Sequence, residues 1–234
     1  MKTVILAGGL GTRISEETDK KPKPMIEING KPIIQHIMEI YASQGFNNFI
    51  VAAGYKAEII IDWAGALKSE LKIEVVDTGL NTQTAGRIKM CLEKSNGDTY
   101  FVTYGDGLGN INLRKLLEFH QATGRMATVT AVRPPARFGS LDFKQDLVTS
   151  FGEKQHSDSG WINGGFFCLN RDILKYLSNS NQSLEFDVLP RVTDDRQLSA
   201  FRHEGFWQPM DTLREKIQLN ELAKKSPPPW LTWM

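Results

Sequence analysis

Short apolar runs alternate with longer amphipathic segments through the first half of the chain. The apolar runs predict buried strands, because each is short, rich in apolar and β-branched residues and bounded by Gly, Asp or another polar residue. These runs lie at 3–7, 49–53, 73–77 and 99–106. The amphipathic segments predict helices within 32–45, 56–69, 84–94 and 112–122. Repeated strand–helix–strand units imply parallel strands joined by crossover connections, and therefore an α/β fold.

Beyond residue 125 the pattern changes to shorter and more closely spaced β runs. These lie at 126–134, 139–143, 147–154 and 164–170. Two short helices and the segment 198–211 follow, and a last helix is predicted over 212–225, with basic residues at its C-terminal end that favour the helix dipole. We expect antiparallel or mixed strands in this half, folded over the first half as a lid, and an extended Pro-rich tail at 226–234.

Composition and charge exclude several classes of function. With 234 residues, 41% of them hydrophobic and 24% charged, the chain is long enough for one large α/β domain. A net charge of +1 provides no overall field that would attract nucleic acid or a membrane surface. Cys91 and Cys168 have no metal or redox spacing, which indicates a packing role in a reducing compartment. We find no signal-peptide or membrane-spanning pattern and expect a cytoplasmic protein.

The first predicted strand runs into a glycine-rich loop, GGLGTR, at 8–13. A dinucleotide fingerprint would need Gly where Ile14 stands, and a P-loop would end in Gly-Lys-Ser/Thr rather than Gly-Thr-Arg. Two readings remain: a loop whose amides bind an anion beside the Arg13 guanidinium, or a tight turn without a ligand. Lys23 favours the first, because two flanking prolines restrict its backbone, as suits a lysine aimed at a phosphate.

Together, GGLGTR and the segment PKPM at 22–25 resemble the signature of the sugar-1-phosphate nucleotidyltransferase family. The likeness covers essentially the whole chain and is greatest to the cytidylyltransferase branch that acts on glucose 1-phosphate. Segments similar to that branch, in the same order, are 76–79, 84–89, 103–107, 134–143, 162–167 and 205–216. Two departures are a shorter connection before residue 73 and the pair Lys154-Gln155, where relatives generally have Lys-Pro.

The resemblance implies a Rossmann-like three-layer α/β/α nucleotidyltransferase fold with a mixed, mostly parallel central sheet. It implies one domain over 1–234, with a nucleotide-binding half at 1–125 and a sugar-binding and metal-ligand half at 126–234. The implied reaction transfers a cytidylyl group from CTP to α-D-glucose 1-phosphate and releases pyrophosphate. Mg²⁺ is the implied cofactor and a homo-oligomer the implied assembly.

Such a transfer depends on positioning and on charge neutralisation more than on covalent groups. By resemblance, Arg13 would neutralise the leaving pyrophosphate, and Lys23 would hold the α-phosphate or the sugar phosphate. The implied nucleotide-binding residues are Leu6, Ala7, Gly8, Gly9, Leu10, Gly11, Thr12, Thr82, Gly86, Arg87 and Gly105. For Arg87, pairing with a surface carboxylate is the alternative.

Asp106 and Asp211 are the candidate metal ligands, since Mg²⁺ favours carboxylates together with phosphates. Asp106 follows a predicted strand in Gly-Asp-Gly, where a turn-forming role is the alternative. Asp211 precedes the last predicted helix, and taken alone it is better explained as the N-cap of that helix. The family order of the two residues favours metal binding.

Sugar contacts are expected from the second half of the chain. The candidates are Phe138, Gly139, Glu153, Lys154, Asn163, Gly164 and Trp207. Their structural alternatives are a turn for 138–139 and for 163–165, a solvated charge pair for 153–154, and core packing for Trp207. We expect His36 and His120 to be packing residues on apolar helix faces, and no histidine to be catalytic.

Three functions compete. The first is the cytidylyl transfer described above, and the second is the same chemistry with another sugar 1-phosphate or another nucleotide such as UTP or dTTP. The third is a non-catalytic nucleotide-sugar-binding domain, which would be free to lose one of Arg13, Lys23, Asp106 and Asp211, although all four are present. An NAD-dependent oxidoreductase fits worst, because Ile14 interrupts the fingerprint.

Overall fold

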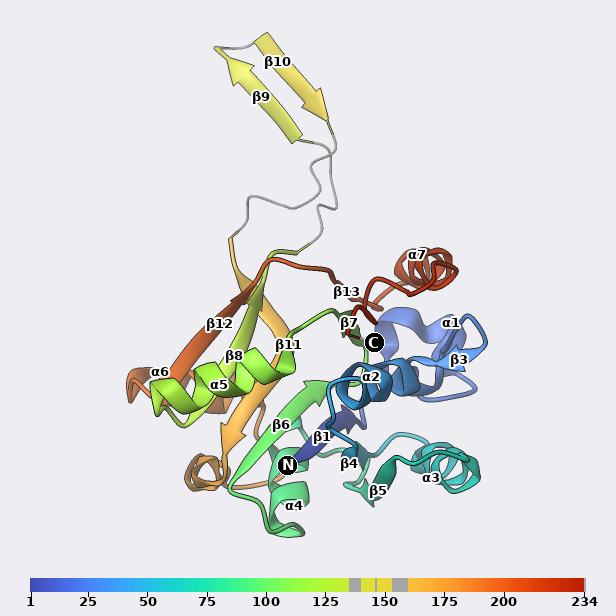
Figure 1. Cartoon of the computed structure of the whole chain (residues 1–234), viewed down its shortest axis with the longest axis vertical. Helices are drawn as coiled ribbons and strands as arrows, with labels where there is room; N and C mark the ends of the chain where they lie inside the picture. The colour runs from blue at the N-terminus through green and yellow to red at the C-terminus, as the bar shows by residue number, and fades with distance from the viewer. Residues whose placement is uncertain (135–139, 146, 153–159, 234) are drawn as a thin grey trace.

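The computed structural model describes residues 1–134, 140–145, 147–152 and 160–233. In this part of the chain a seven-stranded sheet runs through the molecule, with helices on both faces (Figure 1). Its strands are β1 (Lys2–Ala7), β4 (Asn48–Ala53), β5 (Lys72–Asp77), β6 (Thr99–Tyr104), β8 (Ala127–Val132), β11 (Ile162–Asn170) and β12 (Leu198–His203). Their spatial order is β12-β8-β11-β6-β1-β4-β5, in which only β11 runs antiparallel to its neighbours. The predicted mixed, mostly parallel sheet is confirmed.

The helices include five that begin and end close to their predicted positions and one, at 15–18, that was not predicted. They are α1 (Ser15–Thr18), α2 (Ile33–Ala42), α3 (Ala57–Ala66), α4 (Thr84–Glu93), α5 (Leu113–Thr123), α6 (Leu189–Asp194) and α7 (Leu213–Ala223). Short 3-10 or π segments are η1 (Thr12–Ile14), η2 (Lys23–Met25), η3 (Arg171–Tyr176) and η4 (Leu184–Val188). No helix among the described residues is long and apolar enough to cross a bilayer.

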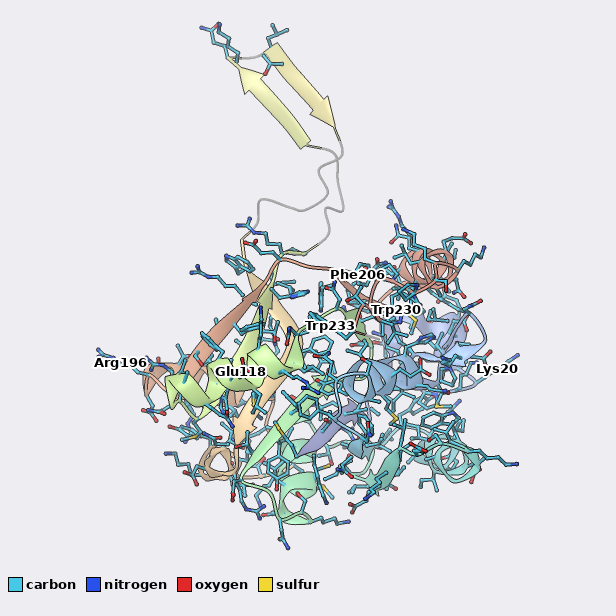
Figure 2. The ribbon with its side chains drawn as sticks, viewed as in Figure 1. Lys20, Glu118, Arg196, Phe206, Trp230 and Trp233 are labelled. Atoms are coloured by element: carbon cyan, nitrogen blue, oxygen red, sulfur yellow. The ribbon has the colours of Figure 1, made fainter. Side chains whose placement is uncertain are left out.

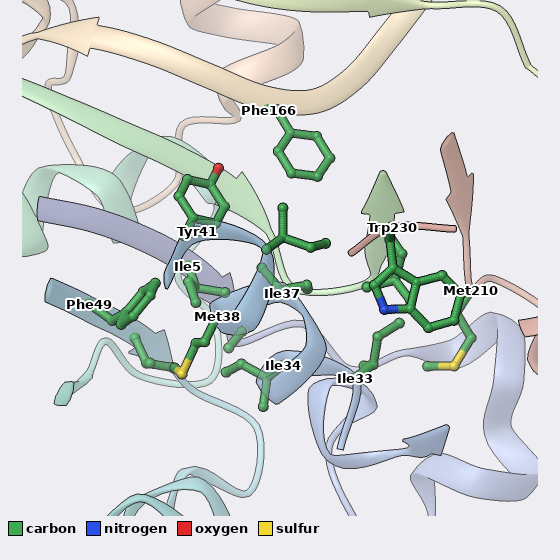
Figure 3. Close-up of a cluster of buried hydrophobic side chains, with 14 of the residues drawn as sticks. Ile5, Ile33, Ile34, Ile37, Met38, Tyr41, Phe49, Phe166, Met210 and Trp230 are labelled. Atoms are coloured by element: carbon green, nitrogen blue, oxygen red, sulfur yellow. The ribbon is translucent and has the colours of Figure 1, made fainter. Parts of the chain in front are cut away.

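Alternate side chains of the central strand β1 face two separate hydrophobic clusters, because successive strand residues point to opposite faces. Ile5 and Ala7 pack with apolar residues of α2, α3, α5 and α7. Val4 and Leu6 pack with those of α4, η3, η4 and α6. Figure 3 shows the first cluster, in which side chains of α2 fill the space beside Ile5. The sheet is therefore covered on both faces, as a three-layer α/β/α fold requires.

In the described part of the second half, the central strands do not form the expected lid. Its strands β8, β11 and β12 extend the sheet of the first half, with β11 placed directly beside β6. Short alternating runs predict strands, but they do not indicate which partner each strand pairs with, and that was the source of the error. Within this half, β9 (Ser140–Lys144) and β10 (Leu147–Gly152) form a separate antiparallel hairpin, drawn at the top of Figure 1.

The C-terminal tail is anchored by Trp230, which is completely buried in the first cluster. Its ring packs edge-on against His36, with 5.5 Å between centroids, and lies 5.9 Å from the ring of Phe206. Figure 2 labels Trp230 and Phe206, and Figure 3 shows Trp230 beside Ile33 and Met210 in the first cluster. The tail is therefore part of the core rather than a loose extension.

Trp230→Ala is expected to lower the free energy of unfolding by about 3–5 kcal/mol, because it removes a large buried ring and leaves a cavity. Denaturant unfolding measures the change, with Trp233→Ala as the matched control, since Trp233 is 38% exposed. Trp233→Ala should lower the free energy of unfolding much less than Trp230→Ala does. Equal losses in the two variants would show that Trp230 does not anchor the tail.

Candidate active site

A pocket of about 350 Å³ opens at the carboxyl ends of β1 and β6, and this volume is typical of ligand sites. The chain passes from β1 to β4 and β5 on one side and returns to β6 on the other. Where the strand order reverses in this way, the connecting loops leave in opposite directions and open a crevice. The sequence-predicted residues that line it are Leu6, Ala7, Gly8, Gly9, Gly11, Thr12, Arg13, Lys23, Thr82, Arg87, Gly105 and Asp106.

The glycine-rich loop lines one side of this pocket. Leu6 and Ala7 still belong to β1. Leu6 pairs with both β4 and β6, and Ala7 pairs with β4, so their amides lie within the sheet. Among the described residues, no acceptor takes a hydrogen bond from the amides of 8–11. Gly11 has φ +67°, a left-handed conformation that favours glycine and turns the chain into η1. Unpaired amides at such a turn can bind an anion.

Four charged side chains form one connected cluster at the pocket. The Lys23 ammonium donates to Asp106 Oδ2 and to Asp211 Oδ1, both at 2.7 Å. Arg13 Nη1 donates to the other oxygen of Asp211, also at 2.7 Å. Burial by itself would lower the pKa of Lys23, which is 8% exposed, but the two carboxylates outweigh burial and raise it. Lys23 is therefore charged at neutral pH and partly neutralises both acids.

The pairing of two short strands brings Asp211 to Asp106 from more than a hundred residues away. β7 (Gly107–Gly109) and β13 (Trp207–Pro209) run antiparallel, with Pro209 opposite Gly107. Just beyond this pair the amide of Met210 donates to the carbonyl of Asp106 at 2.8 Å. The two carboxylates therefore sit side by side because β7 and β13 are in this register.

The interpretation of Asp211 as a helix N-cap is wrong. Thr212 caps α7, accepting from the amide of Glu215 while the Glu215 carboxylate accepts from the amide of Thr212 in a capping box. The Asp211 amide also donates to Glu215, at 2.7 Å. Because the cap is already made, the Asp211 side chain is free to face Lys23 and Arg13.

Asp106 and Asp211 fit a divalent cation that is also bound by phosphates. Both carboxylates contact the ammonium group of Lys23, so a positive charge already lies between them. Within the described residues no group of three or more His, Cys, Asp or Glu could hold a metal by itself. Mg²⁺ needs only one or two carboxylates when phosphates and waters complete its shell, so two are enough.

Arg87 is 4% exposed, and it holds the loops that frame the pocket. Its guanidinium donates to the Thr78 hydroxyl and to the carbonyls of Gly8, Ala53, Gly79 and Leu80. The guanidinium lies so close that a Cβ on Gly8 would be 2.0 Å from it. Burial lowers the pKa of Arg87, and Asp77 opposes this effect. Within the described part of the chain, the hydrogen bonds of Arg87 go to carbonyls and a hydroxyl rather than to a carboxylate, and a nucleotide contact stays a prediction.

Two of the predicted nucleotide-binding residues do not line the pocket. A Cβ on Gly86 would lie 2.7 Å from the backbone of Ser180, so Gly86 allows α4 to pack against that loop. Leu10 is 51% exposed on the outside of the glycine-rich loop. Both positions match the family pattern in sequence, but that pattern does not tell which side of a loop or helix faces the ligand.

Of the predicted sugar contacts, three lie in the described part of the chain. Trp207 is half-buried and donates from Nε1 to the carbonyl of Gly164 at 2.7 Å, while Asn163 is exposed. The side chain of Asn163 donates to the Tyr104 hydroxyl at 3.0 Å and accepts from the amide of Gly165 at 2.8 Å. The other candidates, Phe138, Gly139, Glu153 and Lys154, lie outside the described residues.

Sequence reasoning missed several residues around the pocket. Pro24, Gln83, Thr84 and Tyr104 line it, and Glu185 contacts two of them from η4. Tyr104 directly precedes the Gly-Asp-Gly segment, and this position could have marked it as a candidate site residue. No local pattern marks Glu185, because η4 is separated from β6 by about eighty residues of sequence.

The expected packing roles of the buried histidines and cysteines are confirmed. His36 Nε2 contacts the Ile28 carbonyl at 2.9 Å, and His120 contacts the Thr128 hydroxyl and Asn170. Burial lowers the pKa of both rings, opposed by the Ile28 contact of His36 and by the Asn170 contact of His120. Cys91 and Cys168 are free and buried, and burial raises both thiol pKa values, that of Cys91 to about 12.

A family model described as nucleotidyl transferase matches residues 2–225. The chain belongs to the nucleotidyl transferase family. It is 43% identical over 256 aligned positions to a glucose-1-phosphate cytidylyltransferase of Salmonella typhimurium, with all of both chains covered. It is 39% identical over 255 positions to a probable glucose-1-phosphate cytidylyltransferase of Bacillus subtilis, again with full coverage. Since these 256 positions exceed this chain's 234 residues, the alignment includes positions at which this chain has no residue.

The solved structures show the same fold. HddC from Yersinia pseudotuberculosis, complexed with GMP-PN, has a TM-score of 0.77 at 28% identity, and the match covers 95% of this chain and 99% of HddC. The nucleotidyltransferase fold that the family resemblance implies is thus confirmed.

Proposed function

We propose that this nucleotidyltransferase transfers a cytidylyl group from CTP to α-D-glucose 1-phosphate, giving CDP-glucose and pyrophosphate. The observation that carries the proposal is the cluster of Arg13, Lys23, Asp106 and Asp211 beside the glycine-rich loop, in a chain 43% identical throughout to a glucose-1-phosphate cytidylyltransferase. In the reaction an oxygen of the sugar phosphate attacks the α-phosphorus, and the bond between that phosphorus and the bridging oxygen to the β-phosphorus breaks. The pyrophosphate leaves with the electron pair of that bond.

The chain's own residues position the two substrates and balance their charge. The amides of 8–11 bind the triphosphate, and Arg13, which is exposed, turns from Asp211 to the leaving pyrophosphate. Lys23 holds the α-phosphate and offsets the charge that accumulates as the sugar phosphate approaches. Fixed positive groups of this kind accelerate phosphoryl transfer because they need no reorganisation in the transition state.

Asp106 and Asp211 are the residues that would hold Mg²⁺. When bound, the ion would neutralise phosphate oxygens and so favour both the approach of the sugar phosphate and the departure of pyrophosphate. On the base side, Thr82 and its neighbours in 78–87 are the proposed contacts. On the sugar side, the proposed contacts are Asn163, Gly164 and Trp207.

Pyrophosphate release by the purified protein with Mg²⁺ tests the proposal. CTP, UTP, dTTP, ATP and GTP are each supplied with glucose 1-phosphate, and a reaction without sugar phosphate is the control for hydrolysis. We expect release with CTP to exceed release with each of the others. Faster release with another nucleotide would contradict the choice of base, whereas CTP binding without release from any pair would indicate a binding protein.

A further inference from the structure

The carboxylate of Glu185 is held by three hydroxyl groups and, among the described residues, by no cation. Its Oε2 accepts from Thr84 Oγ1 at 2.8 Å and from Ser183 Oγ at 2.7 Å. Its Oε1 accepts from the hydroxyl of Tyr104. Thr84 in turn accepts from the amide of Leu184 at 2.7 Å, which ties α4 to η4. Because Oε2 accepts from both Thr84 and Ser183, these two contacts hold the carboxylate in place independently of Tyr104.

The hydroxyl of Tyr104 therefore has a defined direction. The hydroxyl carries one proton, and it donates that proton to Glu185 Oε1. With its only proton given to Glu185, the oxygen acts as an acceptor towards Asn163 Nδ2, at 3.0 Å. Glu185 thus decides which end of the Asn163 amide faces Tyr104.

The backbone around Asn163 supports the same orientation. The register between β11 and β8 shifts between Asn163 and Phe167, and irregularities of this kind re-aim side chains next to active sites. Gly165 lies in the shift with φ +77°, and a Cβ there would be 2.4 Å from the Tyr104 ring. Its amide donates to Asn163 Oδ1. Both ends of the amide are therefore held, while one N–H and one lone pair remain for a ligand in the exposed part of the side chain.

We propose that Glu185 is a positioning residue for the acceptor sugar, which fixes Tyr104 and through it presents the Asn163 amide to a sugar hydroxyl. The inference rests on the proposed function, because it assigns the sugar-1-phosphate side of the same site. Glu185 itself does not touch the reacting atoms. Glu185 sets the direction of the Asn163 amide, which distinguishes sugars by the arrangement of their hydroxyl groups. An amide turned the other way would lose its hydrogen bond to the sugar hydroxyl.

Steady-state kinetics with Tyr104→Phe and Glu185→Gln provide the first test. Tyr104→Phe removes the link to Asn163 and leaves the contacts of Glu185 with Thr84 and Ser183, so it isolates the sugar side. Each variant should raise KM for the sugar 1-phosphate about tenfold, with kcat and KM for the nucleotide changed less than about threefold. The double variant should be no worse than the more impaired single variant, because both act through the same contact.

The matched control is Glu118→Gln, since Glu118 is exposed on α5 (labelled in Figure 2) and does not line the pocket. This control should leave both KM values unchanged. Equal increases of KM for nucleotide and sugar phosphate, or no increase in either variant, would overturn the proposal.

The side-chain amide signals of Asn163 in ¹⁵N-labelled protein provide a second readout that needs no turnover. They are identified by their loss in Asn163→Ala. Tyr104→Phe and Glu185→Gln should both shift these signals, and Glu118→Gln should not. If the wild-type protein transfers no nucleotide to any sugar phosphate, the proposed function fails while the shift still supports the contact. Unmoved signals in Glu185→Gln would overturn the role of Glu185 whatever the activity.

Discussion

Lys23→Met is expected to lower the rate of nucleotidyl transfer on the order of 10³-fold, the effect typical of removing a cation that stabilises a transferring phosphoryl group. Methionine keeps the unbranched stem of the side chain as far as Cε and removes the terminal ammonium with its charge. The loss should appear in kcat, because the charge that Lys23 balances is greatest in the transition state. A single-turnover assay under saturating substrates measures the chemical step directly.

The same variant should bind a divalent cation more tightly before any nucleotide is present. Lys23 is the buried cation between Asp106 and Asp211, and its loss leaves two neighbouring carboxylates without it. We expect the free energy of unfolding to fall by about 1–3 kcal/mol, because buried charged groups lose a partner. Added Mn²⁺ should restore most of this loss in the variant and have little effect on the wild-type protein.

Lys21→Met is the matched control, since Lys21 pairs with Glu27 and does not line the pocket. It should leave both the rate and the response to Mn²⁺ unchanged. Near-normal rates in purified Lys23→Met would remove Lys23 from the catalytic residues. If Mn²⁺ does not raise the free energy of unfolding of Lys23→Met, the two carboxylates do not share a cation.

Asp106→Asn is expected to raise the Mg²⁺ concentration needed for half-maximal rate by roughly 10- to 100-fold. Removing a residue that only orients a metal ligand already weakens metal binding by about 10- to 100-fold. Removing the charge of the ligand itself should weaken metal binding at least as much. Asp211→Asn should act in the same direction, and it also releases Arg13, which pairs with Asp211. A metal titration of the initial rate for each variant measures the shift.

Asp62→Asn is the control for these variants, because Asp62 is exposed on α3. Its metal titration should coincide with that of the wild-type protein. If Asp106→Asn also follows the wild-type curve, Asp106 is a turn residue and the metal is held elsewhere. If only Asp211→Asn shifts the curve, the paired-carboxylate site is wrong.

Local sequence determined the elements and the identity of the main candidate residues. The alternation of apolar runs with amphipathic segments predicts β1, β4, β5 and β6 together with helices α2 to α5, because a strand or helix buries one face at its own period. The glycine-rich loop was predicted from chemistry that is also local, since glycines after a strand leave amides unpaired and within reach of an anion.

Only the tertiary structure decided how these pieces work together. Taken alone, Asp211 resembled a helix cap, and only the pairing of β7 with β13 shows that it lies against Asp106. Arg87 matches a ligand position in sequence, yet the fold directs its guanidinium to the carbonyls of the surrounding loops. Trp230 belongs to a Pro-rich tail and nevertheless completes a hydrophobic cluster.

The physical reason is the range of the interactions. Helix period, turn residues and backbone restriction act over a few neighbouring residues, and they can be read from the chain in order. The direction in which Asp211, Arg87 or Glu185 points depends on the register and packing of segments far apart in the sequence. The sequence by itself therefore determined most of the strands and helices and singled out the glycine-rich loop, whereas the long-range register of the sheet and of the β7–β13 pair decided which side chains meet in the pocket.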